Sequence, residues 1–191
     1  MTSDADDALL QRLRAGDEEA FEALFVRHYS LVYGVLYRLM SDRQAAEDVA
    51  QETFLALHQQ PPRVELNGGL AAWLCRVALN RGYNALRGER RARQQVLQAE
   101  DPSTAPDPEA ELMRAEERAG VRAALGDLPE RQGKLLLLRH AGFSYAEIAA
   151  VLEVAPGSIG TLLVRAERAF LEAYRRANPA GREEELDVGL L

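Results

Sequence analysis

The sequence predicts an all-α fold, with two small helical domains joined by a flexible linker. Along most of the chain, apolar residues recur at intervals of three and four, which is the spacing of the buried side of an amphipathic helix. No stretch alternates apolar and polar residues in the manner of a half-buried strand. The segment Glu100–Pro108 holds three of the eight prolines and several acids. Because proline disfavours helix, this segment predicts an extended linker between two helical blocks.

The linker sets the expected domain boundaries. A length of 191 residues allows two small domains of about 80 residues each. We expect the first domain over residues 1–94, the linker over 95–109, the second domain over 110–176 and a frayed acidic tail over 177–191.

Capping and helix-breaking residues divide the first block into four helices. Asp4 or Asp6 can cap a first short helix that Gly16 ends, because a short polar side chain satisfies the first backbone amides and glycine readily adopts the left-handed conformation that closes a helix. Asp17 can cap the second helix, and two glutamates follow in its first turn, where the helix dipole favours acids. The remaining boundaries are Ser41-Asp42 between the second and third helices, Pro61-Pro62 after the third, and a fourth helix from about Leu70 to Arg93.

The second block contains the most specific local pattern in the chain. Its helices are expected over about 109–126, 130–141, 144–152 and 156–176. Ser144 followed by Glu147 predicts a capping box at the start of one helix, and Pro156 suits the first turn of the next. Two helices joined by so short a break are typical of a helix-turn-helix, whose second helix can enter the major groove of DNA. A plain helical hairpin is the alternative.

The periodicity of the last helix separates its buried side from its outward-facing sides. Ile159, Leu163, Ala166 and Phe170 form the expected buried stripe. Residues on the other sides can contact phosphates or base edges. These candidate DNA contacts are Ser158, Thr161, Leu162, Arg165 and Arg168.

The formal net charge of −7 argues at first against a nucleic-acid partner, because nucleic acid attracts basic surfaces. The charge is distributed in blocks, however. Residues 61–94 hold seven basic and two acidic residues, and residues 131–176 hold seven basic and four acidic residues, whereas the segments before, between and after them are acidic. Two basic segments between acidic ones indicate separate surfaces for separate partners.

The residue patterns of common enzyme and metal sites are missing from the sequence. His28, His58 and His140 form neither an H-E-x-x-H nor an E-x-x-H pair, and the single cysteine, Cys75, excludes a multi-cysteine zinc site. The chain has no G-x-x-x-x-G-K-[ST] phosphate loop and no G-x-S-x-G elbow. We therefore assign no catalytic residue, no metal ligand and no cofactor, and we expect Cys75 to be a packing residue.

The N-terminus and the apolar runs bear on cellular location. Residues 1–7 are polar and acidic and lack the basic and then apolar pattern of a signal peptide. No apolar run approaches the roughly 20 residues that span a bilayer. We expect a soluble, cytoplasmic protein without membrane insertion.

Three segments, taken in order, resemble one protein family. They are AAEDVAQETFLALH (45–58), AAWLCRVALNRGYNALRGERR (71–91) and LPERQGKLLLLRHAGFSYAEIAAVL (128–152) with the helix that follows. Together they are similar to the extracytoplasmic-function sigma factors of bacterial RNA polymerase. The resemblance implies an alternative sigma factor, not an enzyme, that binds core RNA polymerase and promoter DNA and directs promoter-specific initiation. It also implies an anti-sigma protein as a candidate further partner.

The resemblance assigns different roles to the two domains. In such factors the first domain binds the clamp helices of the polymerase and opens the −10 promoter element, and the second binds the −35 element. Polymerase binding then falls on residues of the third helix, which are Glu47, Asp48, Gln51, Glu52 and Phe54. Recognition of the −10 element falls on residues of the fourth helix, which are Arg76, Asn80, Asn84, Arg87, Arg90 and Arg91. Recognition of the −35 element falls on the candidate DNA contacts of the last helix.

This chain departs from the family pattern at the start of the last helix and in the loop 61–69. Gly160 and Leu162 stand where the family usually has Lys and Arg, which lowers the expected attraction for −35 phosphates. The loop lies where the family captures an unstacked base, and it has no aromatic side chain to stack on one. Two alternatives stay open. One is a stand-alone helix-turn-helix transcriptional regulator, and the other, which Gly160 and Leu162 suggest, is a sigma-like paralogue that has lost promoter activity.

Overall fold

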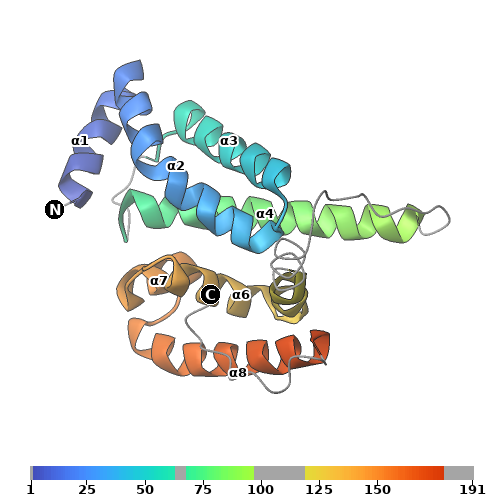
Figure 1. The fold of residues 1–191 in the computed structure, drawn as a ribbon. Coiled ribbons are helices and arrows are strands. Elements are labelled where there is room, and N and C mark those ends of the chain that lie inside the picture. The colour runs from blue at the N-terminus through green and yellow to red at the C-terminus, as the bar shows by residue number, and fades with distance from the viewer. Residues whose placement is uncertain (1, 63–67, 97–118, 179–191) are drawn as a thin grey trace, which may run out of the picture.

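A computed structural model describes residues 2–62, 68–96 and 119–178 (Figure 1). Within these ranges all regular structure is helical and no strand occurs, which confirms the predicted fold class. The helices of the first block are α1 (Thr2–Arg14), α2 (Glu18–Met40), α3 (Arg43–Gln59) and α4 (Gly69–Val96). Those of the second block are a helix over 119–127, α6 (Glu130–His140), α7 (Tyr145–Leu152), the 3₁₀ turn η1 (Pro156–Ser158) and α8 (Ile159–Ala177). We call α1–α4 the first domain and residues 119–178 the second domain.

Several expected segments fall outside the described residues. They are most of the loop 61–69, the linker beyond residue 96 and the tail beyond residue 178. The helix α4 ends at Val96, so it continues past the expected end at Arg93 and into the first two residues that were expected to belong to the linker.

The capping residues of the second and third helices are where the sequence predicts them. The Asp17 carboxylate accepts hydrogen bonds from the backbone N–H groups of Glu19 and Ala20, at 3.0 and 3.3 Å. The helix α2 ends at Ser41, whose φ of 52° is left-handed, and the Asp42 side chain accepts from the Ala45 N–H at 2.9 Å to begin α3. These side chains satisfy amides that have no partner within the helix.

Asp6 has a different position from the expected one. The helix α1 begins at Thr2, so Asp6 lies inside the helix and does not cap it. Its side chain is buried, with the Arg27 Nη1 at 2.5 Å from one carboxylate oxygen and the His28 Nε2 at 2.9 Å from the other. Both partners are on α2, so Asp6 joins the first two helices. A buried carboxylate needs such partners because burial removes its hydration.

The four helices of the first domain bury one apolar core. Phe54 on α3 is 1% exposed and packs against Phe25 and Tyr29 of α2, with ring centroids 4.8 and 6.1 Å apart. On α4, Leu74 and Cys75 are fully buried. Burial raises the pKa of the Cys75 thiol to about 12, as suits a packing residue.

The second domain contains the predicted helix-turn-helix. The Ser144 hydroxyl accepts from the Glu147 N–H, and the Glu147 carboxylate accepts from the Ser144 N–H at 2.8 Å, so the capping box is confirmed. The chain then bends by 106° between α7 and the segment of η1 and α8. The stripe that packs α8 against the domain is the predicted one: Ile159, Leu163, Ala166 and Phe170 are all buried.

The two domains pack against each other mainly through α4, which contacts α6 and α7, and α2 also contacts α6. Figure 1 shows α4 above α6 and α7, with α8 on the side of the second domain that faces away from α4. The acidic helix α3 lies above α4, away from the second domain. Within the described residues, no single helix is long and apolar enough to cross a membrane, and the bent pair of α7 with η1 and α8 meets the length and composition test only as a pair.

Candidate functional site

The exposed side of α4 carries the polar residues that the sequence singles out. Spacings of four, four and three residues place Arg76, Asn80, Asn84 and Arg87 on one side of the helix, and all four are exposed. The opposite side is fixed in the core by apolar residues such as Leu74 and Ala78. We call the side formed by Arg76, Asn80, Asn84, Arg87 and Arg90 the basic face of α4.

Side chains of the second domain occupy the basic face of α4. The Arg76 Nη2 lies 2.7 Å from the Glu153 carboxylate, at the end of α7. The Lys134 Nζ on α6 donates to the Asn80 Oδ1 at 2.6 Å. One turn further along α4, Tyr83 lies under the Lys134 ammonium, which is 5.5 Å from the centre of the ring.

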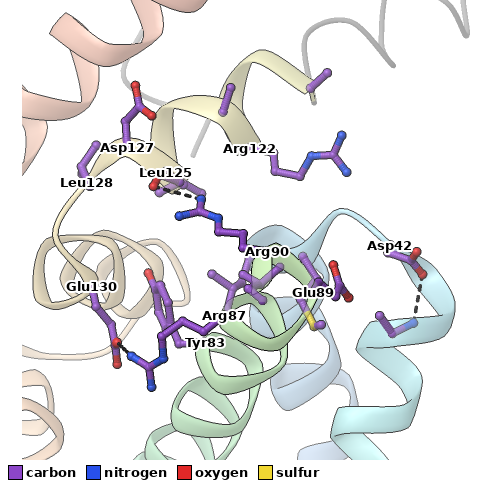
Figure 2. Close-up of a pocket in the computed structure, with 17 residues that line it drawn as sticks. Asp42, Tyr83, Arg87, Glu89, Arg90, Arg122, Leu125, Asp127, Leu128 and Glu130 are labelled. Atoms are coloured by element: carbon purple, nitrogen blue, oxygen red, sulfur yellow. Dashed lines mark hydrogen bonds and ion pairs between the residues drawn. The ribbon is translucent and has the colours of Figure 1, made fainter. Parts of the chain in front are cut away.

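The C-terminal half of the face contacts the helix 119–127 and the start of α6. The Arg87 Nη1 lies 2.6 Å from the Glu130 carboxylate, and another nitrogen of the same guanidinium donates to the Asn84 side chain. Arg90 donates to the backbone carbonyl of Gly126 at 3.1 Å. Figure 2 shows these arginines extending from α4 toward the second domain, around a cavity of about 550 Å³ that Arg122 also lines. Arg91 is exposed, and the structure describes no contact for it.

The contact between α4 and α6 shifts the pKa values of two of its residues, Glu130 and Tyr83. Burial would raise the pKa of Glu130, but Lys134 and then Arg87 outweigh that effect and lower it. Burial, with a smaller contribution from Glu130, raises the pKa of the Tyr83 hydroxyl far above its usual value. That hydroxyl is buried and has no hydrogen-bond partner in the described structure.

The acidic side of α3 is a second candidate surface. Asp48, Gln51 and Glu52 are exposed and Glu47 is half-buried, whereas Phe54, the fifth predicted residue of this surface, is buried. Phe54 therefore lies in the core and not on this surface. Two of the acids are neutralised within the first domain, since Glu47 pairs with Arg43 at 3.0 Å and Glu52 pairs with Arg81 at 3.0 Å. Asp48 and Gln51 are left facing solvent.

The outward side of α8 is a third candidate surface. Thr161, Arg165 and Arg168 are exposed, as the sequence predicts. Ser158 is half-buried and its hydroxyl donates to the Ala155 carbonyl at 2.6 Å. Leu162 is also half-buried and packs against the core.

Sequence reasoning missed one exposed apolar residue on the same helix. Val164 is 66% exposed, next to the buried Leu163. The signal was available, because a valine outside the i, i+3, i+4 stripe of an otherwise amphipathic helix must face outward. Sequence reasoning also missed Glu130, Lys134 and Glu153 as partners of α4, and no local pattern could have found them.

Comparisons with known proteins identify the family. The model of sigma-70 region 2 matches residues 24–92, and the model of sigma-70 region 4 matches residues 118–170. The RNA polymerase sigma-H factor of Pseudomonas aeruginosa is 31% identical over 92% of this chain and 96% of its own length. The ECF RNA polymerase sigma-E factor of Haemophilus influenzae is 30% identical over 84% of this chain and 90% of its own length. The chain belongs to the extracytoplasmic-function family of RNA polymerase sigma factors. It is an alternative sigma factor that directs promoter-specific transcription initiation.

Solved structures share the fold of this sigma factor. CnrH, in complex with the cytosolic domain of CnrY, superposes with a TM-score of 0.66 at 22% identity, over 88% of this chain and 96% of CnrH. The sigma factor RpoE of Bartonella quintana, in complex with the anti-sigma factor NepR, superposes with a TM-score of 0.59 at 24% identity, over 85% of this chain and 98% of RpoE. Both domains of this chain therefore have the architecture of sigma-factor domains. Among the described residues, no cluster of three or more metal-ligating side chains occurs.

Proposed function

We propose that this sigma factor uses three separate surfaces in initiation. The acidic side of α3 binds core RNA polymerase, the basic face of α4 reads the melted −10 element, and the outward side of α8 reads the −35 element. The observation that carries this proposal is the single-sided arrangement of arginines and asparagines along α4, on a helix whose other side is held rigidly in the core.

The basic face of α4 has suitable chemistry for single-stranded DNA. The amides of Asn80 and Asn84 each offer a donor and an acceptor, which can pair with the edge of an unpaired base. Arg76, Arg87 and Arg90 lie on either side of these amides and can bind phosphates, with Arg91 extending the charge beyond them. The rigid helix fixes the spacing between the base contacts and the phosphate contacts, which sets the register of the strand.

The exposed acids of α3 suit a basic partner surface on the polymerase. Asp48 and Gln51 face solvent one turn apart, with Glu47 and Glu52 beside them. Complementary charges of this kind direct docking and suppress wrong partners. Because Phe54 is in the core, the surface consists of the polar residues alone.

The outward side of α8 suits the major groove of duplex DNA. Thr161 and Arg165 are exposed near the start of the helix, where a recognition helix contacts bases and phosphates. Arg168 lies three residues further along and can reach the DNA backbone. Gly160 and Leu162 supply no charge, so we expect a −35 contact with few phosphate interactions and weak binding of duplex DNA by the free protein.

Other parts of the proposal concern the chain as a whole. The first functional unit comprises residues 1–94 and the second residues 110–176, with 95–109 as a linker and 177–191 as an acidic tail. The protein acts in the cytoplasm and carries no catalytic site of its own, since the polymerase makes the bonds. CnrH and RpoE were solved with CnrY and the anti-sigma factor NepR, which supports an anti-sigma protein as a partner here.

The test of this proposal is promoter melting by the holoenzyme carrying an Asn80→Ala variant. On a promoter mapped with the wild-type protein, permanganate reactivity of unpaired thymines reports opening of the −10 element. We expect Asn80→Ala to reduce opening roughly tenfold, since a lost base contact costs about 1–3 kcal/mol, with unchanged binding to core polymerase. The matched control is Gln44→Ala, which removes an exposed amide from α3. Normal melting of the promoter by Asn80→Ala would show that the basic face of α4 does not read the −10 element.

A further inference from the structure

We propose that Val164 reads a thymine of the −35 element, through apolar contact between its side chain and the C5 methyl group of that base. This inference rests on the proposed role of α8 and adds the identity of one base to it. The −35 element of this sigma factor then contains a thymine whose methyl group contributes to binding.

Val164 is an apolar side chain that the fold of the second domain does not bury. It is 66% exposed, whereas Ile159 and Ala166, which anchor α8 in the core, are fully buried on the other side of the helix. Because most of its side chain is in contact with water, Val164 contributes little to the packing of the domain. A partner that covers it would gain the hydrophobic free energy of that area.

Val164 lies among the candidate DNA contacts of α8. Thr161, Val164, Arg165 and Arg168 follow the spacing i, i+3, i+4 and i+7, which places them on one side of the helix, and all four are exposed. The recognition helix of homeodomains reads bases in the major groove from positions with this same spacing. Val164 therefore occupies a position from which a side chain reaches base edges.

Two glycines leave room for a base pair to approach Val164. Helical side chains lean toward the N-terminus of their helix, so the Val164 side chain extends over the turn that contains Gly160. A Cβ atom built on Gly160 would meet only the Tyr145 ring, at 3.8 Å, and one built on Gly157 would meet no atom within 4 Å. Since neither position has a side chain that fills this space, the floor of the groove can come close to the valine.

Positive charges flank Val164 on both sides. Arg165 follows it directly and can bind a phosphate. On the side of Gly160, the exposed Tyr145 lies beside the helix, and the Arg139 guanidinium lies 5.6 Å from the centre of the Tyr145 ring. An apolar side chain between two cations suits duplex DNA, because phosphates line the edges of the groove and the bases form its floor.

Thymine is the base that matches a valine in the major groove. Each base pair presents its own pattern of donors and acceptors there, and thymine adds a methyl group to that pattern. The side chain of Val164 has neither a donor nor an acceptor, so it distinguishes bases by apolar contact and shape. The chemistry on the DNA side is therefore the C5 methyl group.

The experiment removes the methyl group from the DNA and the valine from the protein, separately and together. The probe is duplex DNA with the −35 element of a mapped promoter, in which each thymidine is replaced in turn by deoxyuridine, which pairs identically and lacks only the methyl group. Competition binding measures the affinity of the holoenzyme. We expect one replacement to lower the affinity of the wild-type holoenzyme about fourfold, which corresponds to the roughly 0.8 kcal/mol for burying one methyl group.

The protein variant is Val164→Ser, which removes the apolar side chain at an exposed position. Its holoenzyme should bind the thymidine duplex about as weakly as the wild type binds the deoxyuridine duplex, and it should no longer distinguish the two. Because deoxyuridine can also change the shape of the duplex, this loss of discrimination is the result that assigns the methyl contact to Val164. The matched control is Val26→Ser, which removes a valine that is 71% exposed on α2 and should keep the discrimination.

The outcomes separate this inference from the proposed function of α8. A −35 element without thymine, or equal affinity for thymidine and deoxyuridine at each of its positions, would overturn the inference. Discrimination that persists in Val164→Ser would assign it to duplex shape and would also overturn the inference. A loss of affinity for core polymerase in Val164→Ser, with DNA discrimination intact, would show that the valine contacts protein.

The Arg165→Ala variant tests the role on which the inference depends. If Arg165→Ala weakens binding to the −35 duplex while thymidine and deoxyuridine bind equally well, α8 remains the −35 reader and the inference about Val164 alone fails. If neither Arg165→Ala nor Val164→Ser changes binding to the duplex, α8 is not the −35 reader, and the inference fails with that role.

Discussion

The carboxylate of Glu130 on α6 lies 2.6 Å from the Arg87 guanidinium on α4, although 43 residues separate the two in the sequence. The other carboxylate oxygen of Glu130 pairs with Lys134 at 2.6 Å, and Lys134 in turn holds Asn80. One acid thus joins the proposed −10 surface to α6 of the second domain. If α4 reads the −10 strand as proposed, Glu130 and Lys134 of the second domain contact the same α4 side chains as that strand.

Reversing the charge of Asp48 should abolish binding to core polymerase. Asp48→Arg places a cation on the acidic side of α3, where the partner surface is expected to be basic, and a like-charge contact costs several kcal/mol. We expect at least a 100-fold loss of affinity, measured by competition binding to core enzyme, with an unchanged melting temperature because Asp48 is exposed. The control is Glu22→Arg, an exposed acid on α2. Normal affinity for Asp48→Arg would show that α3 is not the docking surface.

Removing Arg165 should lower the salt dependence of −35 binding. Each lost phosphate contact reduces the slope of log K against log salt concentration by about one. We expect this reduction for Arg165→Ala when the holoenzyme binds duplex DNA that carries the −35 element. Arg175→Ala, at the exposed C-terminal end of the same helix, should leave the slope unchanged. Equal slopes for wild type and Arg165→Ala would exclude a phosphate contact at this position.

Truncating Phe54 should destabilise the first domain. The side chain is 1% exposed among aromatic rings, so Phe54→Ala leaves a cavity and should lower the free energy of unfolding by about 3–5 kcal/mol. The neighbouring Leu55 is 53% exposed, and Leu55→Ala should cost less than about 1 kcal/mol. Urea unfolding measures both values. A small effect of Phe54→Ala together with a lost polymerase contact would restore Phe54 to the binding surface.

The buried histidine of the first domain should make stability fall in mild acid. Burial lowers the pKa of His28, and the opposing charge of Asp6 does not restore it. As the pH falls through about 6.5, the imidazole of His28 binds a proton in the unfolded chain but stays neutral in the folded chain. The free energy of unfolding is therefore highest above that pH and declines as the pH falls through it. Urea titrations at pH 7.5, 6.5 and 5.5 measure this decline.

A histidine variant identifies the source of that decline. His28→Gln keeps a donor for Asp6 and removes the titration, so its slope between pH 7.5 and 5.5 should be shallower than that of the wild type. Some slope should remain, because burial, with a smaller effect of Arg38, lowers the pKa of His140 as well. An unchanged slope in His28→Gln would remove His28 as the cause.

Local signals correctly predicted the caps of α2, α3 and α7. Asp17 and the Ser144–Glu147 pair act within three or four residues of their own position, so the sequence nearby contains all that determines them. The buried stripe of α8 is equally local, since Ile159 and Leu163 follow from the helical period. These features depend on spacing alone and not on what packs against the helix.

Long-range contacts account for the wrong and missing predictions. Asp6 has the residue type of a helix cap, but Arg27 and His28 from the next helix bind it inside the fold. Phe54 belongs to a motif with a surface role, yet the aromatic side chains of α2 bury it. The contacts of Arg87 and Asn80 depend on how two domains meet, and no periodicity within either domain encodes that arrangement.

Mapping of transcription start sites tests the central claim most directly. Core RNA polymerase transcribes a library of genomic promoter fragments with this protein, without it, and with the Asp48→Arg variant, and the 5′ ends are sequenced. The account predicts start sites that appear only with the wild-type protein and that share two sequence elements at a fixed spacing, one near −10 and one near −35. Start sites that are the same with and without the protein would contradict it.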